Sequence, residues 1–134
     1  MINEDILYLR KTNRGTILNY KNNVVKEVPV ILEKLLDTAL AKDLSTLRGR
    51  LDATKKVYHI KKHVPIYLSK YIVLIQSRNK KELNNIYINS YNILDMIEDN
   101  SKTIILFSDN STYTVDTKYH LMKKYYDLSL KIKK

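Results

Sequence analysis

The sequence contains no cysteine and no tryptophan, and it has only two glycines, two prolines and one phenylalanine. Without cysteine the chain cannot form a disulfide bond, a cysteine-ligated metal site or a thiol nucleophile. Two glycines cannot build the glycine-rich loops that hold nucleotide phosphates. No apolar run approaches the roughly 20 residues that cross a bilayer, and Glu4 and Asp5 stand where a signal peptide carries positive charge. We therefore expect a cytoplasmic protein that belongs to none of these enzyme classes.

Positive charge is the most prominent feature that the sequence does have. Its 134 residues include 24 lysines and arginines but only 14 aspartates and glutamates, which gives a net charge of +10. The excess of lysine over arginine is typical of an AT-rich genome, which explains part of this charge. The apolar fraction of 44% is that of a folded protein, and the length suits a single domain over residues 1–134. The remaining charge indicates a polyanionic partner, nucleic acid first and an anionic membrane second.

The positive charge is concentrated in residues 41–81, which contain eleven basic and two acidic residues. A solvated lysine-rich face is the simple alternative, but concentration in one third of the chain favours a binding surface. Basic side chains neutralise phosphates and release counterions, so they give affinity without base specificity. We expect double-stranded DNA, and no membrane, as the partner. The predicted DNA-binding residues are Arg10, Lys11, Arg14, Arg48, Arg50, Lys55, Lys56, Lys61, Lys62, Arg78, Lys80 and Lys81.

The N-terminal part of the chain is predicted to form a meander of three short strands. These strands cover residues 6–9, 16–20 and 24–25, where apolar and β-branched side chains gather. Residues 13–15 and 21–23 are rich in asparagine and glycine, which tolerate the left-handed backbone region that turns require. We therefore expect these two stretches to connect the strands.

The next segment is predicted to be helical. Apolar residues recur every three to four positions over residues 30–47, which predicts one amphipathic helix. Asp43 or Ser45 is expected to cap a second helix that runs toward Val57. Several of the basic residues would lie on this second helix.

Pro65 ends the helical pattern and begins a stretch of strands. Residues 66–68, 71–75 and 86–88 are predicted strands, separated by a charged loop over residues 76–82. The strand at residues 71–75 is apolar throughout, and we expect it to be the central buried strand of a sheet.

Three further strands are predicted at residues 93–97, 103–107 and 112–115. A tight hairpin turn is expected at Asp109 and Asn110, because both residue types accept positive φ. The turn at residues 98–101 is expected to join the first two of these strands.

A terminal amphipathic helix completes the prediction. Asp116 or Thr117 is expected to cap it, and its apolar residues share one broad face as far as Ile132. Together these elements predict an α+β fold. It would have a small antiparallel β-sheet or partial barrel, one or two internal helices and a C-terminal amphipathic helix.

No residue pattern supports catalysis or metal binding. His59 and His63 would share a helix face, as metal ligands can, but no third ligand lies near them in the sequence. Asp95, Glu98 and Asp99 form an acidic cluster that turn and hairpin-edge carboxylates explain more simply. We predict no catalytic residue, no metal, no cofactor and no enzymatic activity. The eleven tyrosines either stack on bases or fill the rim of a core, and the sequence leaves both open.

Several short stretches, taken in order, resemble one known family. They are residues 7–15, 36–39, 45–50 (Ser-Thr-Leu-Arg-Gly-Arg), 61–66 (Lys-Lys-His-Val-Pro-Ile) and 104–115 followed by Tyr119. They resemble the opening strand and turn, the Ser-rich stretch ending in Gly-Arg, the Lys/His–Pro–Ile element and the distal hairpin of the ComK family of competence transcription factors. The cysteine and the tryptophan that the family carries near residues 39–40 and 85–89 are missing here.

This resemblance implies a ComK-like transcription activator that binds AT-rich promoter boxes, usually as a homo-oligomer, and switches on DNA-uptake genes. An adaptor–protease system sets the activity of such proteins. Narrow minor grooves at A/T boxes attract arginine side chains. Arg48 and Arg50 are therefore the expected minor-groove contacts.

Besides non-specific binding of RNA or other nucleic acid through lysine charge alone, two alternatives remain open at this point. A shortened or mobile-element relative would be a non-enzymatic regulator that binds host proteins, with its apolar, tyrosine-rich last helix pairing across a dimer. The C-terminal part also resembles a LytTR-type DNA-binding domain, with strand, strand, polar turn, strand and helix in that order. The second alternative keeps DNA binding and changes only the docking geometry.

Overall fold

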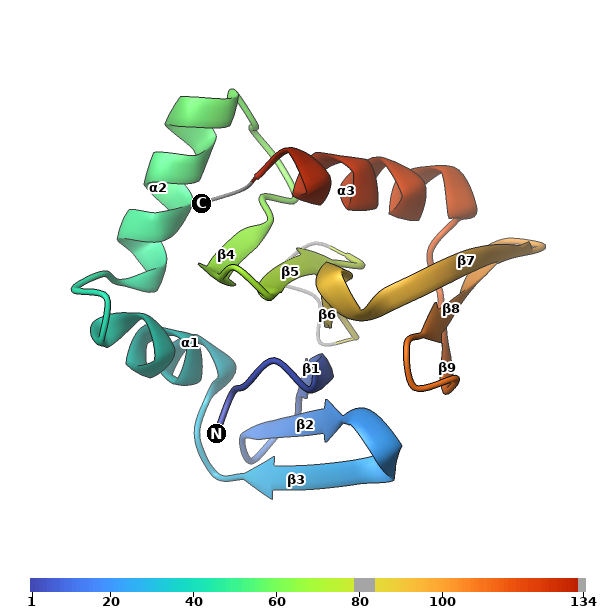
Figure 1. The fold of residues 1–134 in the computed structure, drawn as a ribbon, viewed down its shortest axis with the longest axis horizontal. Coiled ribbons are helices and arrows are strands. Elements are labelled where there is room, and N and C mark those ends of the chain that lie inside the picture. Colours follow the sequence, from blue (N-terminus) through green and yellow to red (C-terminus); the bar gives the residue numbers. More distant parts are fainter. Residues whose placement is uncertain (79–83, 133–134) are drawn as a thin grey trace.

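Two antiparallel sheets and three helices make up the fold in a computed structural model, which describes residues 1–78 and 84–132 (Figure 1). The larger sheet has six strands and the smaller has three, and within the described residues neither closes into a barrel. The predicted α+β class is confirmed, with two sheets, two internal helices and a C-terminal helix.

The six-stranded sheet combines the first three strands with three from the middle of the chain, in the order β3-β2-β1-β6-β5-β4. Its strands are β1 (Ile6–Lys11), β2 (Thr16–Tyr20), β3 (Val24–Val28), β4 (Ile66–Ser69), β5 (Ile72–Gln76) and β6 (Ile86–Asn89). The smaller sheet is the meander β7 (Ile93–Asp99), β8 (Lys102–Phe107) and β9 (Thr112–Val115). Each predicted strand thus matches an observed one.

The helices are α1 (Leu32–Ala41), α2 (Leu47–Tyr58) and α3 (Tyr119–Lys131). Helices α1 and α2 lie at one side of the six-stranded sheet, and α3 runs across the top of β5 and β7 in Figure 1. Short 3₁₀ turns occur at Lys21–Asn23 and Ser90–Asn92. In the described part of the chain, no helix is both long enough and apolar enough to span a membrane.

Two apolar cores lie on opposite faces of the six-stranded sheet. The first core comprises Ile6, Leu9, Leu18, Tyr20, Leu32, Leu35, Leu36, Leu40, Ile66, Leu68, Ile72, Leu74 and Tyr87. The second core comprises Leu7, Ile75, Ile86, Ile88, Ile93, Met96, Ile105, Phe107, Val115, Met122 and Tyr125. Successive strand residues point to opposite faces of a sheet. One face of the six-stranded sheet therefore packs against α1 and α2, and the other face packs against the smaller sheet and α3.

Strand β5 is buried along its whole length because both of its faces are covered. Leu74 belongs to the first core and Ile75 to the second. The prediction of a buried strand at residues 71–75 is therefore confirmed, but its predicted central place is wrong. The strand lies second from the β4 edge, and β1 and β6 occupy the centre of the sheet. An apolar run in the sequence indicates that a strand is buried. It does not indicate where the strand lies in the sheet, because strand order depends on pairing between distant segments.

Two buried asparagines fix the junction between the sheets. The Asn89 amide nitrogen donates to the carbonyl oxygens of Ile6 at 3.2 Å and Tyr71 at 3.1 Å, and its oxygen accepts from the Val73 N–H at 3.1 Å. The Asn92 amide nitrogen also donates to the Ile6 carbonyl, at 2.8 Å. Because buried backbone groups need partners, these bonds hold the start of the smaller sheet against β1 and β5.

The polar turns use asparagine in the left-handed region, as expected. Asn22 and Asn23 have φ of 63° and 62°, and Asn110 has φ of 71°. Asp109 does not adopt positive φ, so the prediction for that residue is wrong. Its carboxylate instead accepts the Asn22 N–H at 2.9 Å and the Ser111 hydroxyl at 2.6 Å. Burial opposes ionisation of Asp109, but these hydrogen bonds outweigh it and hold its pKa below the ordinary value.

The single helix predicted over residues 30–47 is wrong, because the helix ends at Ala41. Leu44 adopts a left-handed conformation with φ of 59° and is 97% exposed. Its spacing continues the apolar pattern although its side chain contributes nothing to the core. The apolar spacing in the sequence therefore continues past Ala41, where the helix itself ends and the chain changes direction.

The capping residue of α2 also differs from the prediction of Asp43 or Ser45. Thr46 is the N-cap, and its hydroxyl accepts the Gly49 N–H at 3.0 Å. The Asp37 carboxylate accepts the N–H of the first residue of α2 at 2.6 Å. A side chain from α1 thus satisfies a free N–H group at the start of α2 and fixes the angle between the helices.

The predicted caps of α3, Asp116 and Thr117, are wrong as well. Lys118 occupies the N-cap position and makes no side-chain capping bond. The Thr117 hydroxyl donates to the Ser77 carbonyl at 2.8 Å, and its own carbonyl accepts the Thr103 hydroxyl at 2.8 Å. Thr117 therefore connects the entry of α3 to β5 and β8 rather than capping the helix.

Candidate nucleic-acid interface

Helix α2 presents a basic face to solvent. Thr54 is buried and Leu51 is half-buried, whereas Arg48, Lys55 and Lys56 are exposed. Residues seven apart return to the same side of a helix, so Arg48 and Lys55 project in one direction. The helix thus carries its charge where an extended polyanion can reach it.

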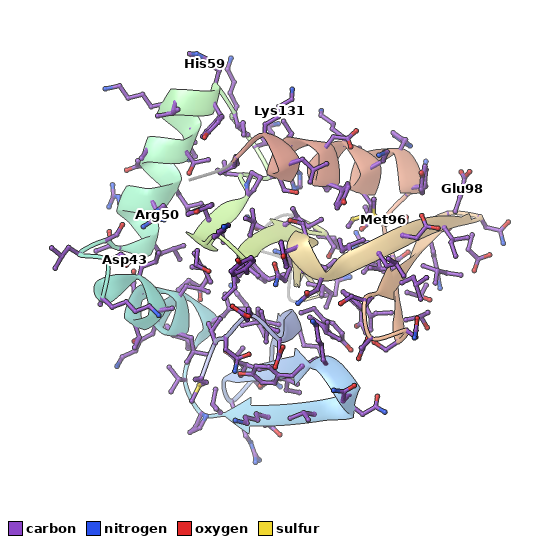
Figure 2. All side chains as sticks on the ribbon, viewed as in Figure 1. Asp43, Arg50, His59, Met96, Glu98 and Lys131 are labelled. Atoms are coloured by element: carbon purple, nitrogen blue, oxygen red, sulfur yellow. The ribbon has the colours of Figure 1, made fainter. Side chains whose placement is uncertain are left out.

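Arg50 differs from its neighbours because its side chain turns toward the protein. Its Nη1 donates to the Tyr67 carbonyl at 2.9 Å, and its guanidinium carbon lies 5.7 Å from the centre of the Tyr67 ring. Figure 2 shows Arg50 between α2 and the strands. The structure therefore places Arg50 in the contact between α2 and β4.

The loop that follows α2 places two more lysines in solvent. Ile60 and Val64 of this loop are buried against Ile132, at the end of α3. These contacts fix the loop from below, and Lys61 and Lys62 remain exposed above it. A buried apolar support therefore carries exposed cationic side chains, which suits phosphate contact.

The two histidines of this region are not placed as a metal pair. His59 ends α2 with φ of 57°, and His63 has φ of 52°, so residues 59–63 are not helical. The His63 ring stacks on Tyr125 with 4.5 Å between the ring centres. Among the described residues no group of three or more potential metal ligands occurs.

Helix α3 adds basic residues that are not among the predicted DNA-binding residues. Lys124 and Lys131 are exposed and lie seven residues apart, on one side of the helix. Figure 2 shows Lys131 across the loop from His59. We define the α2–α3 basic surface as Arg48, Lys55, Lys56, Lys61, Lys62, Lys124 and Lys131. The seven-residue spacing of the two lysines was visible in the sequence, but the contact between α3 and the loop was not.

The apolar face of α3 is used inside the fold. Met122 and Tyr125 are buried in the second core, and Tyr119 and Tyr126 pack at its rim. For these tyrosines the structure shows core packing. The same burial removes the surface that the dimer hypothesis required, because an apolar helix face cannot pair with a second copy while it covers a core.

Four other predicted residues lie outside the helices α2 and α3 and outside the loop that follows α2. Lys11, on β1, forms an ion pair with Glu33 at 2.6 Å, and Arg78, after β5, forms one with Asp116 at 2.9 Å. Arg10 is exposed on β1, and Arg14 is exposed in the turn between β1 and β2. The predicted residues Lys80 and Lys81 lie outside the described residues.

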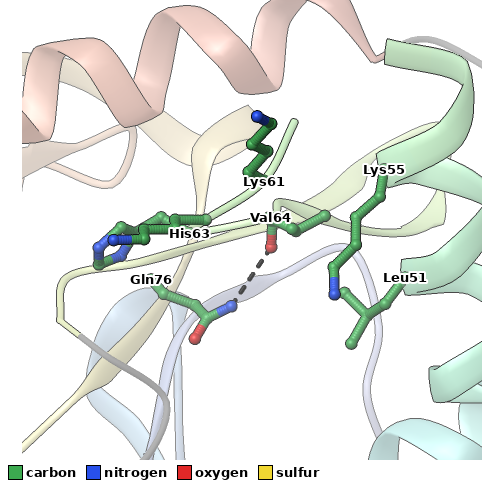
Figure 3. A pocket seen from close by; sticks show the side chains of 7 residues that line it. Leu51, Lys55, Lys61, His63, Val64 and Gln76 are labelled. Atoms are coloured by element: carbon green, nitrogen blue, oxygen red, sulfur yellow. Dashed lines mark hydrogen bonds between the residues drawn. The ribbon is translucent and has the colours of Figure 1, made fainter. Parts of the chain in front are cut away.

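A hollow of about 320 Å³ lies between α2 and the loop (Figure 3). We call it the lysine pocket, and it is lined by Leu51, Lys55, Lys61, Lys62, His63, Val64 and Gln76. The Gln76 amide nitrogen donates to the Val64 carbonyl at 3.3 Å, as the dashed line in Figure 3 shows. No carboxylate is part of this lining.

Comparison with known protein families identifies a relationship over most of the chain. The model of the ComK protein family matches residues 6–133 of the chain, which is nearly its whole length. No curated protein and no solved structure matches significantly.

Proposed function

Because the chain belongs to the ComK family, we propose that it is a competence transcription factor that binds DNA through the α2–α3 basic surface. The family is one of non-enzymatic transcription factors, so the protein is not an enzyme. The family match spans the C-terminal hairpins and helix as well, and a separate LytTR-like domain is not needed to account for them.

The observation that carries the choice of surface is the gathering of exposed cations on three neighbouring segments. Arg48, Lys55 and Lys56 on α2, Lys61 and Lys62 on the loop, and Lys124 and Lys131 on α3 are all exposed. Ile60 and Val64 of the loop pack on Ile132 at the end of α3, which brings the loop and α3 together. Cations on such a surface release counterions from DNA and supply affinity. By contrast, Lys11 and Arg78 are neutralised by acidic partners.

Base preference would come from Arg48, which is exposed near the start of α2. An arginine inserted into the narrow minor groove of an A/T box meets an enhanced negative potential. Arg50 is bound to Tyr67, and we assign it the role of positioning α2 instead. The proposed targets are therefore AT-rich promoter boxes of DNA-uptake genes.

The family membership also supports three further parts of the proposal. We infer that the protein acts in the cytoplasm, binds its sites as a homo-oligomer and is controlled by an adaptor–protease system. The alternative is a regulator that binds host proteins, which predicts little DNA affinity near physiological salt.

The test is fluorescence anisotropy with an AT-rich and a GC-rich duplex of equal length across a salt series. We expect tighter binding to the AT-rich duplex at every salt concentration, with log K falling by about 0.9 per unit of log salt for each phosphate contacted. Equal, weak binding that disappears near physiological salt would overturn the proposal and favour the protein-binding alternative.

A further inference from the structure

The lysine pocket is a concave cationic site within the α2–α3 basic surface. Lys55 enters its lining from α2, and Lys61 and Lys62 enter from the loop, so the charges come from two separate elements. Figure 3 shows Lys55 and Lys61 on different sides of the hollow. Among the described residues no acidic side chain forms an ion pair with any of these three lysines.

We propose that the lysine pocket binds a phosphate-bearing anion, either a backbone phosphate of DNA or the phosphate group of a free small molecule. Three cations around one hollow repel one another, and an anion between them relieves that repulsion. Lysine is a common phosphate ligand, because its ammonium group is a compact charge with three donors.

The floor of the pocket is built before any ligand arrives. The Gln76 side chain is buried, and its two ends are both bound, the nitrogen to the Val64 carbonyl at 3.3 Å and the oxygen to the Asn85 amide at 3.2 Å. Leu51 and Val64 supply apolar surface beside it. An apolar floor lowers the local dielectric and strengthens the attraction between the lysines and an anion.

The loop that carries Lys61 and Lys62 is also held in place. Its neighbours Ile60 and Val64 are buried, and His63 stacks on Tyr125 of α3. Binding therefore requires ordering of lysine side chains but not of the backbone, which keeps the entropic cost of binding low.

The size of the pocket limits the ligand. A volume of about 320 Å³ is close to the lower limit of the roughly 300 to 1,000 Å³ of small-molecule sites. It accommodates a phosphate group with a small body attached, and it excludes a base pair. DNA would therefore contribute a single protruding phosphate. Binding of a DNA phosphate in the pocket rests on the proposed function, whereas binding of a free small molecule does not.

The experiment is isothermal titration calorimetry of the full chain with inorganic pyrophosphate. The pocket variant is Lys55→Ala with Lys61→Ala, and the matched control is Lys56→Ala with Lys124→Ala, which removes the same charge from exposed lysines outside the pocket lining. We expect the Kd for pyrophosphate to be about tenfold higher in the pocket variant, because charge-assisted hydrogen bonds are lost. In the control variant we expect this Kd to change by less than about twofold. Far-UV circular dichroism confirms that both variants are folded.

Equal weakening in the two variants, or no pyrophosphate binding by the wild type, would overturn the inference. Anisotropy with the AT-rich duplex then separates the two phosphate sources. Competition between pyrophosphate and DNA, with DNA affinity reduced more in the pocket variant than in the control, assigns the pocket to a DNA phosphate. No competition, with DNA affinity reduced equally in the two variants, assigns it to a free ligand. Selective pyrophosphate binding by a chain that does not bind DNA would support the pocket and reject the proposed function.

Discussion

Gly15 shows at the scale of one residue how closely the first turn packs on the rest of the chain. A Cβ atom at this position would lie 2.0 Å from the Val28 carbonyl oxygen and 2.9 Å from the Val30 nitrogen. The neighbouring Thr16 hydroxyl donates to the Val30 carbonyl at 2.8 Å. The turn between β1 and β2 is therefore fixed against the segment that leads into α1.

Gly15→Ala should lower the free energy of unfolding by about 3 kcal/mol, because the methyl group meets backbone atoms that cannot move aside. Gly49→Ala is the control, since its Cβ would meet only the Thr46 hydroxyl at 3.1 Å. Better helix propensity offsets that contact, and we expect a change within about 1 kcal/mol. Urea denaturation followed by circular dichroism measures both, and equal stabilities would contradict the packing argument.

Helix α2 separates a structural arginine from an exposed one within a single turn. Arg50→Ala should lower the free energy of unfolding by about 1 to 2 kcal/mol, because the Tyr67 carbonyl loses its donor and the stem loses its packing. Arg48→Ala should change stability by less than about 0.5 kcal/mol, yet weaken binding to the AT-rich duplex more than Arg50→Ala does. Thermal denaturation and anisotropy on the same samples test this, and a reversed order in either measurement would reject the assigned roles.

The elements themselves were predictable where pattern and backbone agree. The strands from residue 93 to 115 were predicted because short apolar and β-branched runs separated by polar turns specify hairpins locally. The boundary between α1 and α2 was not, because Leu44 keeps the apolar spacing while its backbone reverses direction. The N-cap of α2 is Thr46 and not the predicted Asp43 or Ser45. The start of α2 also depends on Asp37 of α1, whose carboxylate accepts the first N–H of α2. Bonds between elements leave no local signal.

The candidate site was predictable in part. Charge density located α2 and the loop, because residues 41–81 carry most of the excess charge. It could not show that Arg50 faces Tyr67, or that Lys11 and Arg78 are paired with acids from other elements. Nor could it add the lysines of α3. Those assignments depend on which segments meet in three dimensions.

For the whole molecule, the six-stranded sheet connects the two cores and should make unfolding cooperative. Leu74→Ala removes a side chain from the first core and Ile75→Ala removes one from the second. Each should cost about 3 kcal/mol, and each should lower the midpoint of a single transition. Differential scanning calorimetry tests this, and a separate early transition in either variant would show that the cores unfold independently.

The pairing of β1 with β6 also has a consequence for the growing polypeptide on the ribosome. Tyr8 lies opposite Ile88, so one side of the first strand has no partner until the chain has been extended by some 80 residues. At about 5 to 20 residues per second, that interval lasts roughly 4 to 16 seconds. During it the nascent β1–β2–β3 hairpins expose an open edge to neighbouring chains on the same messenger. Arg10 is exposed on β1, and its charge, which disfavours pairing between like strands, should protect that edge until β6 has been synthesised.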